Sequence, residues 1–305
     1  MGTVVSVQVV GCAPASAKAR ALRALAWFTH VETACSRFVP ESELRQLCAT
    51  VGVVVPVSDV LFELVQFSVA LAEATNGAFD PTVGAAMVAR GFDRDWRHGR
   101  STSGVATDVG TMEVRTSWRD IELDVGARTL RLCRPLLLDL GAVAKGLALD
   151  LAAQDLADVA HFAIDAGGDL YLAGHNGAGA PWSVGIRHPR MPEHLLMTLH
   201  VSGRAVCTSG DYEKRTAAGD GHHLLDPREH HISATALVSA TVIADHAMVA
   251  DGLSTAAFVM GLTAGRALLD DHGVDGLLVG DDGTSVCTNG MAQYRVQSPV
   301  SVTHG

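Results

Sequence analysis

Apolar and polar positions along this 305-residue chain change their period several times, which predicts a mixture of helices and strands. Apolar residues three and four apart are typical of helices, and they predict helices at 16–35, 58–75, 141–160 and 246–261 and a short one near 263–271. Alternating or short apolar runs are typical of strands. They predict strands at 3–10, 118–124, 128–134, 162–174, 182–189, 197–203, 204–209 and 234–243, and two more near the end of the chain.

The order of these elements favours an α+β fold, with mixed sheets and flanking helices. Strands do not alternate regularly with helices, as a doubly wound parallel sheet would require. Residues 92–118 are rich in Arg, Asp, Gly, Ser and Thr, so we expect an irregular excursion there. The length allows one large domain or two modest ones.

Composition narrows the classes of function. The net charge is −10 and there is no basic run, which argues against nucleic acid or an anionic membrane as the main partner. We expect no segment long and apolar enough to span a membrane. The six cysteines lie far apart without a CxxC pair, which indicates free thiols. The first residues, MGTVVSVQVVG, show no signal-peptide pattern, so we predict a cytoplasmic location.

Asp251 is the one carboxylate within the apolar stretch HAMVADGLSTAAFVMG, residues 246–261. Thr255 lies four residues later, on the same face of the predicted helix. Carboxylate and hydroxyl oxygens are ligands that Mg²⁺ selects. The alternative is structural: an Asp in the first helical turn and a Thr that bonds back to the Asp251 carbonyl. Taken alone, the pair favours the structural interpretation.

A second candidate is LLLDLGAVAKGLALD, residues 136–150. An apolar strand ends at Asp139, a glycine turn follows, and a helix begins near Ala142 with Lys145 in its first turns. A helix N-terminus beside a lysine can bind an anion. An ordinary strand-to-helix turn with an exposed lysine explains the pattern equally well.

Three weaker motifs complete the candidates. NGAFDPTVG, residues 76–84, predicts a rigid turn. Gly167-Gly168 indicates either a close backbone approach to a ligand or a bulge. His222 and His223 precede LLDP, and a histidine there could accept a proton at neutral pH. A zinc site built from the histidines lacks a regular ligand spacing.

The order of the short motifs along the chain is more specific than any one of them. MGT, SRFVPESEL, NGAFDPTVG, LDLGAVAKG, IDAGGDL, WSVGIRHP, TSGDYE, HHLLDP and ADGLSTAAFVMG occur between residues 1 and 261. This series resembles the ApbE family, the FAD:protein FMN transferases. The resemblance implies a fold related to the T-fold. It also implies a single domain over residues 1–305, in which two α/β lobes could flank a cleft for FAD.

The resemblance also implies an activity: transfer of FMN from FAD to a Ser or Thr hydroxyl of an acceptor flavoprotein, with Mg²⁺ and with release of AMP. The implied metal ligands are Asp251, Thr255, the region of Ala142 through a main-chain carbonyl, and Ser254. The implied FAD contacts are Met1, Phe38, Ala78, Phe79, Asp80, Asp139 and Lys145. His223 matches a histidine that assists catalysis, and Lys145 would add positive potential at the pyrophosphate.

This chain departs from the family pattern in two places. Arg228-Glu229-His230-His231 stands where a Thr-Gly turn is usual, so the substrate-facing loop differs. Phe38 stands where the family commonly has an aromatic residue that carries a hydroxyl. The phenylalanine keeps stacking and loses a hydrogen bond.

Two other functions share the predicted site. One is a Mg²⁺-dependent FAD pyrophosphatase that gives FMN and AMP, and the other is a protein that binds FAD without turnover.

Overall fold

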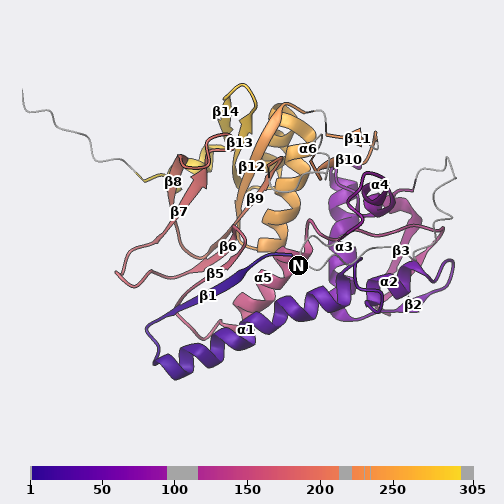
Figure 1. Ribbon diagram of the computed structural model, residues 1–305, viewed down its shortest axis with the longest axis horizontal. Helices are drawn as coiled ribbons and strands as arrows, with labels where there is room; N and C mark the ends of the chain where they lie inside the picture. Colours follow the sequence, from indigo (N-terminus) through magenta and orange to yellow (C-terminus); the bar gives the residue numbers. More distant parts are fainter. Residues whose placement is uncertain (1, 95–115, 213–221, 230, 234, 297–305) are drawn as a thin grey trace, which may run out of the picture.

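The structure is a computed structural model that describes residues 2–94, 116–212, 222–229, 231–233 and 235–296 (Figure 1). The α-helices in these residues are α1 (Pro14–Cys35), α2 (Glu43–Cys48), α3 (Asp59–Ala74), α4 (Gly84–Ala89), α5 (Ala144–Asp155) and α6 (Ala247–Asp271). Short 3-10 helices are η1 (Pro81–Val83), η3 (Trp118–Asp120) and η4 (Asn289–Tyr294).

A seven-stranded sheet forms the centre of the molecule, in the order β1-β5-β6-β9-β12-β13-β14. Its strands are β1 (Val5–Val10), β5 (His161–Ala166), β6 (Asp169–Ala173), β9 (Arg204–Gly210), β12 (Leu237–Ala244), β13 (Asp275–Gly280) and β14 (Ser285–Cys287). Each neighbouring pair in this sheet is antiparallel. The predicted α+β class is therefore confirmed.

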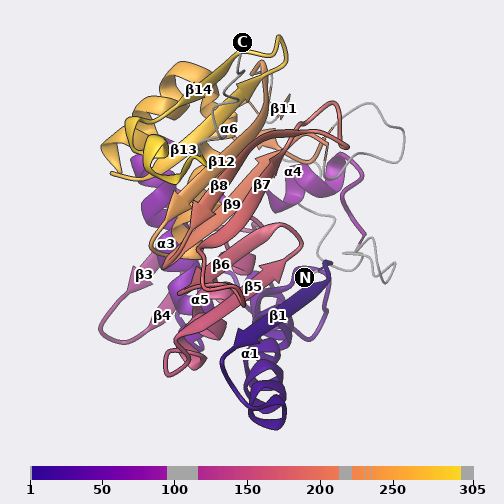
Figure 2. The ribbon, with the colours of Figure 1, turned by 90° about the vertical axis from the view of Figure 1, so that its left-hand side faces the viewer.

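Different elements cover the two faces of this sheet. Helices α1, α5 and α6 pack on one face, and the hairpin β7 (Trp182–Arg187) and β8 (Leu195–Val201) lies over the other (Figures 1 and 2). Side chains alternate between the two cores, because successive strand residues point to opposite faces. On β9, Val206 joins the hairpin-side core and Cys207 joins the helix-side core. By the same alternation Ser209 points toward the helices.

A smaller layer lies beyond the helices. It contains α3, a three-stranded sheet in the order β2-β4-β3, and the two-stranded pair β10-β11 (Figure 1). These strands are β2 (Val55–Pro56), β3 (Ile121–Asp124), β4 (Thr129–Leu132), β10 (Leu225–Asp226) and β11 (His231–Ile232). The Ser58 hydroxyl accepts a hydrogen bond from the Leu61 amide and caps α3.

The crossing of α5 and α6 is fixed by two close contacts. Asp150 of α5 accepts hydrogen bonds from the Ala247 and Met248 amides at 2.7 and 2.9 Å, and so caps the N-terminus of α6. A Cβ at Gly146 would lie 2.5 Å from the Ala247 carbonyl oxygen and 2.5 Å from the Met248 Cα. Only glycine therefore allows the two helices to approach this closely.

Most predicted elements are confirmed, with differences where tertiary contacts decide. The helix predicted from 141 begins only at Ala144, because residues 141–143 form a turn. The helices predicted at 246–261 and 263–271 are merged in α6, interrupted at Gly261 with φ 83°. Helices α2 and α4 and the pair β10-β11 were not predicted. Most of the expected irregular excursion, at 95–115, lies outside the described residues.

The expectation that no segment could span a membrane is wrong for α6. By length and composition this helix could cross a bilayer, although 56% of its apolar window is buried. Helix α6 packs against β9, β12, β13 and α5. Its apolar composition is accounted for by burial in the core.

We predict that Gly146→Ala destabilises the protein by on the order of 1–3 kcal/mol, because the new methyl group meets backbone that cannot rotate away. Urea unfolding followed by circular dichroism measures this change. Gly177→Ala is the matched control, because a Cβ at Gly177 would meet nothing within 4 Å. Equal stability of the two variants would contradict the close-contact argument.

Candidate active site

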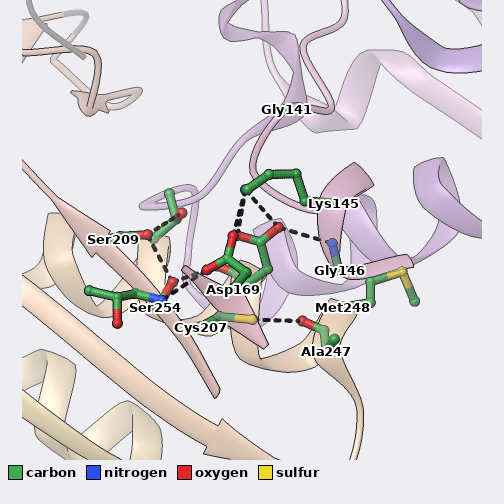
Figure 3. Close-up of polar contacts among 12 residues, drawn as sticks. Gly141, Lys145, Gly146, Asp169, Cys207, Ser209, Ala247, Met248 and Ser254 are labelled. Carbon is green, nitrogen blue, oxygen red and sulfur yellow. Dashed lines mark hydrogen bonds and ion pairs between the residues drawn. The ribbon is translucent and has the colours of Figure 1, made fainter. Parts of the chain in front are cut away.

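Three charged side chains meet where α5, β6 and α6 converge (Figure 3). The Lys145 Nζ atom of α5 lies 3.1 Å from Asp169 Oδ2 at the start of β6. It also lies 3.2 Å from both carboxylate oxygens of Asp251 on α6. The sequence separates these residues by up to 106 positions. One ammonium group therefore joins three elements that are distant along the chain.

The charges of this cluster are largely buried, so each of them is unfavourable unless it is paired. Asp169 and Asp251 are only 4% and 3% exposed, and the Lys145 side chain is 25% exposed. Burial raises the pKa of Asp251 to about 7; Lys145 opposes that rise and Asp169 adds to it. Burial lowers the pKa of Lys145, but the two carboxylates outweigh burial and raise that pKa above its usual value. With both carboxylates ionised, one ammonium leaves an excess negative charge that favours a further cation.

The turn before α5 supplies backbone groups to the same place. The Gly146 amide donates to Asp251 Oδ2 at 3.2 Å. In a regular helix that amide would donate to the carbonyl four residues earlier, at Ala142. The Ala144 amide donates to the Leu140 carbonyl and the Leu147 amide to the Val143 carbonyl, and no backbone bond of this kind to the Ala142 carbonyl occurs among the described residues. The Ala142 carbonyl is thus left available as an oxygen ligand.

Three hydroxyl groups extend the cluster along α6 and β9. Ser209 Oγ lies 2.8 Å from Ser254 Oγ and 3.0 Å from Thr255 Oγ1. Ser254 Oγ donates to the Asp251 main-chain carbonyl at 2.8 Å. The residue that bonds back to this carbonyl is therefore Ser254, and the structural interpretation that assigned this bond to Thr255 is wrong.

The donor set fits a hard divalent cation. Asp251 offers a carboxylate, Thr255 a hydroxyl and Ala142 a carbonyl, all of them oxygen ligands of the type that Mg²⁺ takes. Within the described part of the chain, no three His, Cys, Asp or Glu side chains gather as a metal site. A metal here would therefore depend on hydroxyl and main-chain oxygens, and the histidines described do not form a zinc site.

A second ion pair joins the SRF motif to Asp139 in the segment before α5. Residues 136–140 form no strand, so the apolar strand predicted to end at Asp139 is wrong. Arg37 Nε lies 2.8 Å from Asp139 Oδ2, and Arg37 Nη2 donates to the Phe92 carbonyl. The Arg37 guanidinium lies 4.1 Å from the centroid of the Phe38 ring. The Asp139 carboxylate also accepts from the Gly141 amide at 2.9 Å and so shapes the glycine turn.

The NGAFDP segment packs beside these groups. The Asp139 amide donates to the Pro81 carbonyl at 2.8 Å. Asp80 accepts from the amide and the hydroxyl of Thr82 and from the Trp118 amide, so its carboxylate organises the turn. Phe79 is buried in the main core. Folding thus brings together motifs that the sequence places far apart.

Known proteins resemble this chain over most of its length. Residues 1–278 match the ApbE family. The chain belongs to the ApbE family. It is 28% identical to a FAD:protein FMN transferase of Klebsiella pneumoniae, over 97% of this chain and 86% of that protein. A FAD:protein FMN transferase of Treponema pallidum is 31% identical, over 92% of this chain and 83% of the relative.

Solved ApbE structures share the fold. The crystal structure of the ApbE protein from Thermotoga maritima superposes with a TM-score of 0.81 at 28% identity, covering 97% of this chain and 95% of that one. The flavin transferase ApbE from Vibrio cholerae gives a TM-score of 0.82 at 25% identity, covering 96% of each chain. The family, its architecture and the transferase class predicted from the motifs are confirmed.

Some of the residues implied by the ApbE resemblance share one cluster. Lys145 and Asp251 are in direct contact, and Ser254 and Thr255 are joined through Ser209. A second group surrounds the Asp139 turn. Ala78 and Phe79 are buried there, so FAD would have to reach their backbone rather than their side chains. Met1 lies outside the described residues.

The sequence did not predict two residues of the cluster around Lys145 and Asp251. Asp169 stands within IDAGGDL, where Gly167 and Gly168 give the stronger signal. They form the tight turn between β5 and β6, so the bulge is wrong, whereas the backbone approach to a ligand stays a prediction. Ser209 stands within TSGDYE and carries no signal of its own. Its strand alternates sides, so only the neighbouring helix reveals where the hydroxyl points.

His222 and His223 take different positions before β10. The His222 ring packs edge-on against Phe258 of α6, with ring centroids 5.7 Å apart, and its Nδ1 accepts from the Leu224 amide at 3.2 Å. These contacts give His222 a structural role. His223, also partly buried, remains the histidine that the motif indicates for proton transfer.

We predict that Lys145→Met destabilises the protein by about 3–5 kcal/mol, because two buried carboxylates lose their cation. The folded-state pKa of Asp251 is raised from 3.8 to about 7, so folded protein binds the proton more tightly and loses stability as pH rises through that window. When Lys145 no longer opposes the raised pKa of Asp251, the loss of stability with rising pH is larger. The deficit relative to the unsubstituted protein should therefore grow from about pH 5 to about pH 8.

Urea unfolding at the two pH values, without divalent metal, measures this deficit. Lys18→Met removes an exposed lysine of α1 and is the control. A Lys145→Met deficit that stays constant or shrinks as pH rises would contradict the electrostatic account.

Proposed function

We propose that this chain is a FAD:protein FMN transferase that moves FMN from FAD to a Ser or Thr hydroxyl of an acceptor flavoprotein, requires Mg²⁺ and releases AMP. Its matched relatives carry the name FAD:protein FMN transferase. The observation that carries the proposal is the buried Lys145–Asp251 pair with Thr255 on the same helix. A binding protein without chemistry has no need to bury so much charge.

The metal would be held by Asp251, Thr255 and the Ala142 carbonyl. A bound Mg²⁺ would neutralise the charge that develops on the pyrophosphate during phosphoryl transfer. Ser254, which the resemblance implies as a further ligand, is fully buried between the Asp251 carbonyl and Ser209. We therefore assign it to the support of the site.

The other steps use side chains of this chain. Lys145 lies at the start of α5, where its ammonium and the helix N-terminus both present positive potential to a phosphate. His223 accepts the proton of the incoming hydroxyl. The acceptor oxygen forms a bond to the FMN phosphorus, the bond from that phosphorus to the bridging oxygen breaks, and AMP leaves with the bridging oxygen.

Phe38 and the Asp139 turn are proposed to contact FAD. The Arg37 guanidinium covers one side of the Phe38 ring. A flavin or adenine ring would have to stack from another side.

The single domain, the cytoplasmic location and the acceptor flavoprotein stay predictions.

The two alternatives use the same site. In an FAD pyrophosphatase, water replaces the acceptor hydroxyl and free FMN is released. In a binding protein, FAD stays intact. No observation on the described residues favours either one over transfer.

Incubation with FAD, Mg²⁺ and a candidate acceptor separates the three functions. Transfer predicts covalent flavin fluorescence on the acceptor in a denaturing gel, together with one AMP per flavin attached. Chelation of the metal should abolish both, and added Mg²⁺ should restore them. FMN release without acceptor would indicate the pyrophosphatase, and unchanged FAD would indicate the binding protein.

We predict that Asp251→Ala folds but lowers the rate of FMN transfer by about 100-fold or more, because a carboxylate ligand is worth several kcal/mol at the transition state. Single-turnover transfer measures the rate, and circular dichroism checks the fold. Asp271→Ala, which removes an exposed carboxylate of the same helix, should keep the full rate. A normal transfer rate in Asp251→Ala would exclude the metal site.

We predict that His223→Ala lowers the transfer rate by about 10²–10⁴-fold, the range of a lost general base, and leaves FAD affinity unchanged. Flavin fluorescence titration measures affinity separately from rate. His200→Ala changes an exposed histidine of β8 and is the control. If His223→Ala keeps the full rate, the proton acceptor is another group.

A further inference from the structure

Ser209, Thr255, Ser254 and the Asp251 main-chain carbonyl form one continuous chain of hydrogen bonds. The chain runs from Thr255 Oγ1 to Ser209 Oγ at 3.0 Å, to Ser254 Oγ at 2.8 Å and to the Asp251 carbonyl oxygen at 2.8 Å. Ser209 belongs to β9 and the other three groups belong to α6. No functional role follows for Ser209 from its motif.

The number of hydroxyl protons sets the donor-to-acceptor direction of this series of hydrogen bonds. A carbonyl oxygen only accepts, and each hydroxyl has a single proton to donate. Ser254 gives its proton to the Asp251 carbonyl. Ser209 must then donate to Ser254, and Thr255 must donate to Ser209. Each bond in the chain is satisfied in this arrangement alone.

The direction decides what Thr255 presents to the site. Its only proton points toward Ser209, so the remaining lone pairs of Oγ1 are left for a ligand that accepts electrons. A metal cation is such a ligand. The reverse direction would place the Thr255 proton on the metal side and oppose binding.

We propose that Ser209 is a positioning residue for the metal site: it accepts the Thr255 proton and so holds the Thr255 lone pairs toward a bound divalent cation. The inference rests on the proposed function, because that function supplies the metal. Ser254 serves as the link that fixes the direction rather than as a ligand.

Burial makes the arrangement stable. Ser209 and Ser254 are both buried, so their hydroxyls depend on each other for hydrogen bonds. The side alternation of β9 directs Ser209 to the helix face. Groups that orient metal ligands in this way change metal affinity by about 10- to 100-fold when removed.

The test measures Mn²⁺ binding to the full chain, and the electron paramagnetic resonance signal of free Mn²⁺ reports how much is bound. We expect Ser209→Ala to weaken Mn²⁺ binding by about 10- to 100-fold. Ser239→Ala is the matched control: Ser239 is a buried serine on the neighbouring strand β12, and its Oγ has no hydrogen-bond partner among the residues that the structure describes. It should bind Mn²⁺ like the unsubstituted protein.

A double substitution separates positioning from general destabilisation. If Ser209 acts through the Thr255 hydroxyl, Ser209→Ala should cause no further loss of Mn²⁺ affinity once Thr255→Val has removed that hydroxyl. Additive losses would overturn the proposal. Ser209→Cys, a weaker hydrogen-bonding group of similar size, should give an intermediate affinity and replaces Ser209→Ala if that variant does not fold.

The outcomes distinguish this inference from the proposed function. Mn²⁺ binding by Ser209→Ala within about twofold of the unsubstituted protein, which itself binds Mn²⁺ and transfers FMN, overturns the inference alone. If the unsubstituted protein binds no Mn²⁺ and transfers FMN without a metal, the metal-dependent function is wrong and this inference fails with it.

Discussion

The site depends on one buried interaction, the contact of the Lys145 ammonium with the carboxylates of Asp169 and Asp251. Burying any of these charges alone would be strongly unfavourable, so the three must be brought together by the fold. Each belongs to a different element: α5, β6 and α6. The relative position of these elements is therefore a condition for both stability and chemistry.

The surrounding structure meets that condition with close backbone contacts. Gly146 lets α5 approach the start of α6, and Asp150 caps that start with its carboxylate. The Gly146 amide also donates to Asp251. The same few residues thus set the crossing of two helices, partner a buried carboxylate and free the Ala142 carbonyl. Packing and site geometry cannot be varied independently here.

Much of the site could be predicted, because the chemistry leaves local signals. Asp251 stands out as a carboxylate in an apolar helix, and Lys145 as a lysine after an apolar segment and a glycine turn. Neither signal alone decided between a ligand and an ordinary structural residue, and the ordered motifs changed that balance. Asp169 and Ser209 were missed because each stands in a motif where glycine or turn residues give the stronger signal.

Periodicity and motif order are properties of the chain alone, so they were enough to predict the α+β class, most helices and strands, and the family. Which charges meet, how Ser209 joins the hydroxyls of α6 and where α5 begins depended on the three-dimensional packing. These outcomes depend on contacts between residues up to 106 positions apart. Local spacing carries no information about such contacts, since a side chain's partner is set by how the layers pack.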